Sequence, residues 1–310
     1  MHMPFVVRRL LRLIACLPLL AAAQPAPLAL KRVADGVYMV AAHGVRADAE
    51  NGGHVFNTGV LVGPSGVTVI DPGPSAAFGV RLRAAIGTVT SKPVVLLINT
   101  HAQAEVALAN SAFPGVPVRA HPLAARFMDA RCTVCLANLR AVLGDDALAG
   151  TSVVVPQPVA DRVHVIAAGG RRLRLLPFAG AATVADLALL DEASGTLFTG
   201  ALAAGRAVPD LHDADVAAWL AALERLWQQP FSTVVPGRGG VGRDALADTA
   251  GYLNALQRAA RREVAAGTDL ASVAAPLPQF ASWPGYDALH AANLRRAFVQ
   301  AEAQWLARQP

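Results

Sequence analysis

Two hairpin patterns with the same turn occur in the two halves of this 310-residue chain. Residues 60–71 form an apolar run that breaks at Ser65-Gly66, and residues 188–199 form a second run that breaks at Ser194-Gly195. Because Ser-Gly dipeptides are typical of tight turns, each run predicts a β-hairpin. The repeat predicts two similar sheets that pack together with approximate twofold symmetry.

Helical patterns alternate with short apolar runs along the rest of the chain, which predicts an α/β layered fold. With 54% hydrophobic residues and no charged or low-complexity linker in the middle, we expect one domain around a large core. The strand-like runs are residues 33–40, 60–70, 94–98, 153–155, 173–178, 187–198 and 233–235, and the helical patterns are residues 76–86, 105–112, 123–143, 215–228, a stretch after Asp244, and 286–307.

The N-terminus has the pattern of a cleaved export signal. Arg8, Arg9 and Arg12 precede the apolar run 13–20, and three alanines at 21–23 supply small residues for cleavage. The apolar run is too short to span a bilayer, so we expect no stable membrane insertion and a periplasmic mature protein. The alternative is a lipidation box ending at Cys16, but only three residues separate it from Arg12.

The charge balance of the mature chain is close to neutral. The whole chain has 27 basic and 22 acidic side chains, and loss of the three signal arginines lowers the net charge from +5 to +2. A charge this small does not indicate a nucleic-acid partner.

Residues 100–110 read Thr-His-Ala-Gln-Ala-Glu-Val-Ala-Leu-Ala-Asn. This segment, together with residues 180–187, 198–201 and 235–239, resembles the metal-binding motifs of metallo-β-lactamase-fold hydrolases. The resemblance implies an αββα sandwich, with the domain at residues 24–245 after a signal peptide at 1–23. Residues 246–310 would form a C-terminal helical extension packed on that domain.

Most of the family's metal ligands are replaced in this chain. Only His101 keeps the family residue, although Glu105 retains a carboxylate and Gln103 a weak carbonyl donor. The resemblance implies zinc, which His101 and Glu105 would bind, but one imidazole and two weak donors do not make a tight site. The seven aligned positions are His101, Gln103, Glu105, Val106, Ala182, Ala201 and Arg238.

A narrower resemblance is to the periplasmic quinoprotein relay system zinc metallohydrolases. It rests on residues 43–50, 131–136, 150–151, 208–211 and 293–294, and covers about residues 31–304. It implies a small-molecule ligand or a periplasmic partner, such as a quinoprotein dehydrogenase system.

Arg238 places a permanent positive charge where the family has a histidine, and a guanidinium cannot bind a metal. We therefore expect Arg238 to form a salt bridge with Glu105, whose ionised form a helix start would favour. We interpret His101 as a strand-end histidine that neighbouring polar groups satisfy.

Six further residues are candidates for the site. His43 and His54 flank a glycine-rich loop near the expected pocket mouth, and Asp71 and Asp186 match aspartates that orient backbone at loop corners. Cys132 and Cys135 predict a structural disulfide, or alternatively thiol exchange; two cysteines are too few for a four-cysteine zinc site.

Three functions follow from these patterns. The first is a zinc-depleted pseudoenzyme with a binding or accessory role. The second is an active metal-dependent hydrolase with a rebuilt site, and the third is a thiol redox accessory that uses the Cys-x-x-Cys pair. We favour the first, because most ligand positions have lost their lone pairs.

Overall fold

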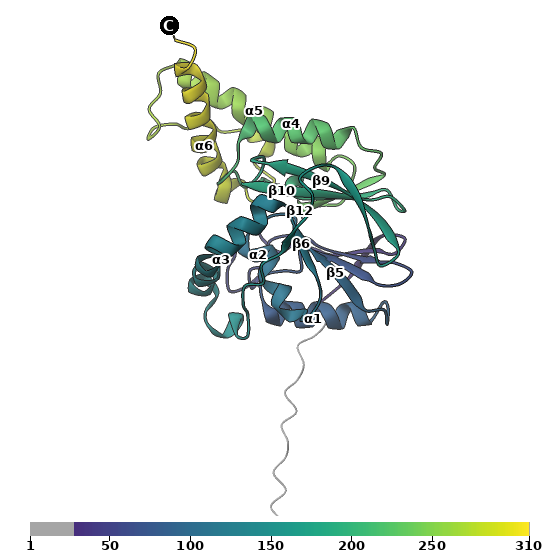
Figure 1. Cartoon of the computed structure of the whole chain (residues 1–310). Helices are drawn as coiled ribbons and strands as arrows, with labels where there is room; N and C mark the ends of the chain where they lie inside the picture. The colour runs from purple at the N-terminus through teal and green to yellow at the C-terminus, as the bar shows by residue number, and fades with distance from the viewer. Residues whose placement is uncertain (1–27, 310) are drawn as a thin grey trace, which may run out of the picture.

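The computed structural model describes residues 28–309, so the predicted signal peptide lies outside the described residues. Two β-sheets lie between two layers of helices (Figure 1). The first sheet has the order β1-β2-β3-β4-β5-β6-β7, and the second has the order β12-β11-β10-β9-β8. Their strands are β1 (Lys31–Ala34), β2 (Val37–Val40), β3 (Thr58–Val62), β4 (Val67–Ile70), β5 (Val94–Ile98), β6 (Val118–Ala120), β7 (Gln157–Pro158), β8 (His164–Ala168), β9 (Arg171–Ala179), β10 (Ala185–Asp191), β11 (Thr196–Gly205) and β12 (Thr233–Gly239).

The helices cover the outer faces of the sheets. Figure 1 shows α1, α2 and α3 beside the first sheet and α4, α5 and α6 beside the second. The helices are α1 (Ala76–Gly87), α2 (Ala104–Ala107), α3 (Pro122–Leu143), α4 (Val216–Trp227), α5 (Ala245–Ala265) and α6 (Tyr286–Leu306), with 3₁₀ turns η1 (Leu108–Ala112), η2 (Asp146–Leu148) and η3 (Pro278–Phe280).

Both predicted hairpins are confirmed. β3 pairs antiparallel with β4, and β10 pairs antiparallel with β11. Gly195 has a φ of 67°, a conformation that favours glycine, at the second turn. The two hairpins lie in different sheets, as the internal repeat predicted.

The two sheets bury a shared apolar layer. Leu61 and Ile70 of the first sheet belong to the same buried cluster as Leu175, Leu189 and Phe198 of the second. Alternate residues of each strand face the helices instead, so each sheet is covered on both sides.

The predicted strand at residues 153–155 is wrong, since these residues have no regular structure. β6, β7 and β8 were not predicted. β6 has three residues and β7 has two, and runs this short cannot be recognised by their periodicity. Within residues 28–309, no helix combines the length and apolar character needed to cross a membrane.

Candidate functional site

Four parts of the chain carry the seven positions that align with metal ligands. His101 follows β5, and Gln103, Glu105 and Val106 lie at or beside α2. The other positions are Ala182 in the loop before β10, Ala201 in β11 and Arg238 in β12. Gln103, Ala201 and Arg238 line one small void, so the fold brings these distant segments together.

His101 is fully buried and its ring is held by neighbours. Nδ1 lies 2.8 Å from Oγ1 of Thr100, and Nε2 lies 3.1 Å from Oε1 of Gln103. The ring also meets Phe56 edge-on, with 4.7 Å between ring centroids. Burial lowers the pKa of His101 to about 3, so the imidazole is neutral.

Thr100 links His101 to Asp71. Its Oγ1 lies 2.6 Å from Oδ2 of Asp71, and a hydroxyl has one proton to donate. That hydroxyl donates to Asp71, and the Nδ1 nitrogen of His101 faces the same oxygen. On the other side of the ring, Nε2 faces the carbonyl oxygen of Gln103. Burial raises the pKa of Asp71 to about 7. A chain of hydrogen bonds therefore runs from Asp71 to Gln103.

Arg238 fills the centre of the aligned site. It is only 6% exposed, its guanidinium carbon lies 4.3 Å from the centroid of the Phe56 ring, and Nη1 donates to the Val45 carbonyl at 2.7 Å. Burial lowers the pKa of Arg238, but arginine remains protonated at physiological pH. The void left beside it has about 20 Å³, which is room for little more than one water molecule.

The predicted salt bridge between Arg238 and Glu105 is wrong. No ion pair within 4.0 Å joins these two side chains in the described part of the chain. Arg238 instead packs against the Phe56 ring and donates a hydrogen bond to the Val45 carbonyl. The charges of Asp210 and, less strongly, Glu105 raise the pKa of Arg238 from a longer distance. Burial raises the pKa of Glu105 although Arg238 acts in the opposite direction, so the expected preference for the ionised form is not seen.

The residues at this position do not fit a zinc ion. A tight site needs three or four nitrogen, sulfur or oxygen donors around one point. Both nitrogens of His101 already have partners, Val106, Ala182 and Ala201 have no side-chain lone pairs, and Arg238 is a buried cation. Within residues 28–309, no group of three or more His, Cys, Asp or Glu side chains is placed to hold a metal.

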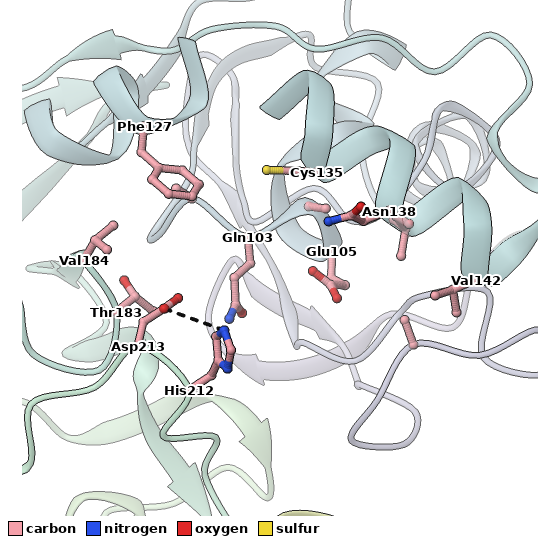
Figure 2. Close-up of a pocket in the computed structure, with 14 residues that line it drawn as sticks. Gln103, Glu105, Phe127, Cys135, Asn138, Val142, Thr183, Val184, His212 and Asp213 are labelled. Carbon is pink, nitrogen blue, oxygen red and sulfur yellow. Dashed lines mark ion pairs between the residues drawn. The ribbon is translucent and has the colours of Figure 1, made fainter. Parts of the chain in front are cut away.

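A larger cavity of about 350 Å³ opens beside the filled position. Figure 2 shows Gln103 and Glu105 between the side chains of α3 and the loop that carries His212 and Asp213. The polar and apolar groups on its wall suit a small ligand that is partly apolar. Its lining residues are Ala47, Ala102, Gln103, Ala104, Glu105, Phe127, Cys135, Asn138, Leu139, Val142, Thr183, Val184, His212 and Asp213.

His43, His54 and Asp186 do not line the cavity. Neither His43 nor His54 lines the cavity: His43 is exposed, and the buried ring of His54 lies 4.4 Å from that of Phe78 in α1. Asp186 accepts hydrogen bonds from the backbone and hydroxyl of Thr183, and burial raises the pKa of Asp186 to about 7. Asp186 thereby fixes a residue of the cavity wall without lining the cavity itself.

The sequence patterns missed several residues of the site. The charge of Asp210 raises the pKa of Arg238, and Nε2 of His212 lies 3.9 Å from Oδ1 of Asp213 at the cavity. Residues 208–211 were part of the sequence resemblance, but that motif assigned no site role to Asp210, His212 or Asp213. Asn138, however, lies one helical turn beyond Cys135, so α3 geometry around the thiol pair could have predicted it.

Cys132 and Cys135 are free thiols in this structure, so the predicted disulfide is not formed. Cys132 is fully buried and its Sγ donates to the Ala102 carbonyl at 3.7 Å. Cys135 lines the cavity, and Figure 2 shows its sulfur on the cavity side of α3.

No protein-family model matches the chain, and no curated protein sequence matches it either. Solved structures do match. A metallo-β-lactamase from Pontibacter korlensis is 21% identical with a TM-score of 0.59, over 73% of this chain and 99% of that one. A metallo-β-lactamase from Hirschia baltica is 18% identical with a TM-score of 0.57, over 73% and 97% of the two chains.

The fold is that of the metallo-β-lactamases. The stereoselective inverting sec-alkylsulfatase Pisa1 from Pseudomonas sp. also matches, at 17% identity and a TM-score of 0.64. That match covers 87% of this chain but only 50% of the sulfatase, so the chain spans about half of that enzyme. At these identities the likeness establishes the metallo-β-lactamase fold, and the chemistry depends on the residues described above.

Proposed function

We propose that this protein is a metallo-β-lactamase-fold pseudoenzyme that binds a small molecule and does not use zinc. The observation that carries the proposal is the buried Arg238, which occupies an aligned ligand position with its guanidinium against Phe56. Loss of donors alone would leave a weak metal site. A buried cation at the same point also repels any metal ion that enters.

The cavity beside Arg238 is the proposed binding site. Phe127, Leu139 and Val142 give it an apolar wall, while Glu105 and Asp213 add acidic groups. A ligand with an apolar part and with amino or other donor groups matches this wall. The cavity volume of about 350 Å³ suits a small molecule rather than a peptide chain.

The cellular role proposed here rests on sequence. The N-terminal pattern supports export to the periplasm, and the resemblance to quinoprotein relay metallohydrolases supports an accessory role beside a periplasmic quinoprotein dehydrogenase system. In that role the scaffold is kept for binding, and turnover is lost.

Metal analysis tests the proposal. The purified mature protein is dialysed against zinc, then against metal-free buffer, and its zinc content is measured per chain. We expect well under one equivalent, both in the wild type and in a C132S/C135S variant that removes adventitious thiol binding. One equivalent retained by both proteins would instead support the alternative, a hydrolase with a rebuilt site.

An R238A variant separates the two causes of metal loss. We expect it to retain no zinc, because removal of the cation restores no donor. If R238A alone gained one equivalent, the guanidinium would be the only barrier, and the remaining residues would form a competent site.

A further inference from the structure

The cavity wall contains a pair of thiols for which the proposed binding function gives no role. Cys132 and Cys135 lie one helical turn apart in α3, within the same helix that supplies Phe127 and Asn138 to the cavity. Cys135 is partly exposed at the wall, whereas Cys132 is fully buried behind it. The two sulfurs therefore differ in access, as the attacking and resolving thiols of an exchange reaction do.

The helix places the two cysteines at a distance that allows a disulfide. Residues three apart in an α-helix have Cα atoms about 5 Å apart. Disulfides span Cα separations of roughly 4.4–6.8 Å. The bond can therefore form when Cys132 leaves the Ala102 carbonyl and rotates toward Cys135, without a change of backbone fold.

We propose that Cys135 attacks a small-molecule disulfide bound in the cavity and that Cys132 resolves the mixed disulfide. In the first step the Cys135 sulfur bonds to one sulfur of the ligand, and the other leaves as a thiolate that takes up the proton of Cys135. In the second step Cys132 attacks Cys135 and releases the second ligand thiol, which takes up the proton of Cys132. The ligand disulfide is reduced to two thiols, and the pair is oxidised to one disulfide.

The electrostatics of the pair support this order of attack. Interaction with the neighbouring Cys132 thiol lowers the pKa of Cys135 to about 7, and the same interaction together with burial raises the pKa of Cys132. Burial and, less strongly, Glu105 act against the lowering at Cys135. The accessible thiol is thus the one that forms the reactive thiolate near neutral pH.

The acidic groups of the cavity indicate the class of disulfide. Glu105 and Asp213 present carboxyl oxygens, which accept hydrogen bonds from ammonium groups and pair with them when ionised, so we infer an aliphatic disulfide that carries ammonium groups. This inference rests on the proposed function only for the location of the ligand. Zinc retention would overturn the proposed function and leave the thiol reaction standing.

Cystamine, a small disulfide with two ammonium groups, is the probe. The full mature protein is reduced with dithiothreitol, desalted and treated with cystamine, and released thiol and protein mass are followed. We expect the wild type to release two thiols per chain and end without an adduct. We expect C132S to release one thiol and keep a mixed disulfide, and C135S to do neither.

Specificity is tested with bis(2-hydroxyethyl) disulfide, which lacks the ammonium groups. At low salt we expect cystamine to react severalfold faster than the uncharged disulfide. This difference in rate should shrink in E105Q. It should persist in the control variant E302Q, which changes an exposed residue of α6. Circular dichroism checks that each variant is folded. Inert thiols in the folded wild type, a C135S protein that still reacts, or a C132S protein that keeps no adduct would each overturn the proposal.

Discussion

At the scale of single residues, two groups of side chains lie at the positions that the sequence resemblance aligned with metal ligands. Arg238 fills the centre and bonds to a loop carbonyl, while Asp71, Thr100, His101 and Gln103 form a hydrogen-bond chain. Buried polar groups are costly unless they are paired. The pairing explains how His101 is accommodated in the protein core.

Substitution of Asp71 tests this chain of hydrogen bonds. In D71N the amide oxygen can accept from the Thr100 backbone N–H, and the amide nitrogen can donate to Thr100 Oγ1, whose own proton then turns to His101 Nδ1. Asn also tolerates the φ of 53° at this position. At about pH 5, below the pKa of Asp71, we expect D71N to change the free energy of unfolding by less than about 1 kcal/mol.

D71A is the matched comparison. It leaves the buried Thr100 N–H without its acceptor and places alanine in a left-handed conformation, so we expect a loss of about 2–4 kcal/mol in urea unfolding. Equal losses in D71N and D71A would show that Asp71 is ionised in the native protein.

The pH dependence of the same pair gives a further prediction. Asp71 has a pKa of about 7 in the native protein and an ordinary value of 3.8, so its contribution to stability is fully present below 3.8 and is lost as pH rises through about 7. We expect D71N to gain stability relative to the wild type, by about 1 kcal/mol or more, between about pH 5 and about pH 8. The lowered pKa values of His54 and His101 make the free energy of unfolding rise with pH instead. Both proteins share this effect, so it cancels when D71N is compared with the wild type. A difference independent of pH would contradict the assignment.

The residue types at the seven aligned positions could be read from the sequence, but the surroundings of Arg238 could not. Each substitution is visible along the chain, so the donor count follows from residue types alone. The partners of Arg238 come from Phe56, Val45 and Asp210, which lie far from it in sequence. Contacts of that kind depend on packing, and a salt bridge with Glu105 was the wrong choice among them.

At the scale of elements, regular helices were predictable and short strands were not. The pattern at residues 123–143 matches α3, and the pattern at 215–228 matches α4 within one or two residues. Long amphipathic repeats determine helices locally, whereas β6 and β7 exist only because neighbouring strands pair with them. The cavity face of α3 follows from the helical spacing of Phe127, Cys135 and Val142.

The N-caps of α4 and α5 allow a matched test of helix ends. Asp215 accepts a hydrogen bond from the Ala218 N–H at 2.9 Å, whereas Asp244 makes no side-chain capping bond at α5. We expect D215A to lower the free energy of unfolding by about 1 kcal/mol. D244A, measured in the same thermal denaturation series, should cost clearly less. The reverse order would contradict the capping geometry.

At the scale of the whole molecule, the C-terminal helices share one core with the second sheet. Trp219, Tyr252 and Phe298 belong to the same buried cluster as Leu190 and Leu202. Asn293 ties these helices to the loop after β11: its Nδ2 donates to Pro209 O and Tyr252 Oη, and its Oδ1 accepts from Leu211 N. That loop continues into the cavity residues His212 and Asp213.

Asn293 is therefore expected to control the order of the cavity loop. N293A removes the partners of buried backbone groups, so we expect a loss of about 2–3 kcal/mol. Amide hydrogen exchange should become faster in residues 208–214 and in α6. N254A is the control, because Asn254 lies on the exposed face of α5 and bonds only to its own helix. Unchanged exchange in N293A would contradict this role.

A crystal structure of the mature protein soaked in zinc, with data collected at the zinc absorption edge, tests the central claim most directly. We predict the Arg238 guanidinium against Phe56, His101 still bonded to Thr100 and Gln103, and no anomalous peak beside them. An anomalous peak about 2.0–2.1 Å from a His101 nitrogen, with further protein donors around it and Arg238 displaced, would contradict the claim that this scaffold replaces its metal with a buried cation.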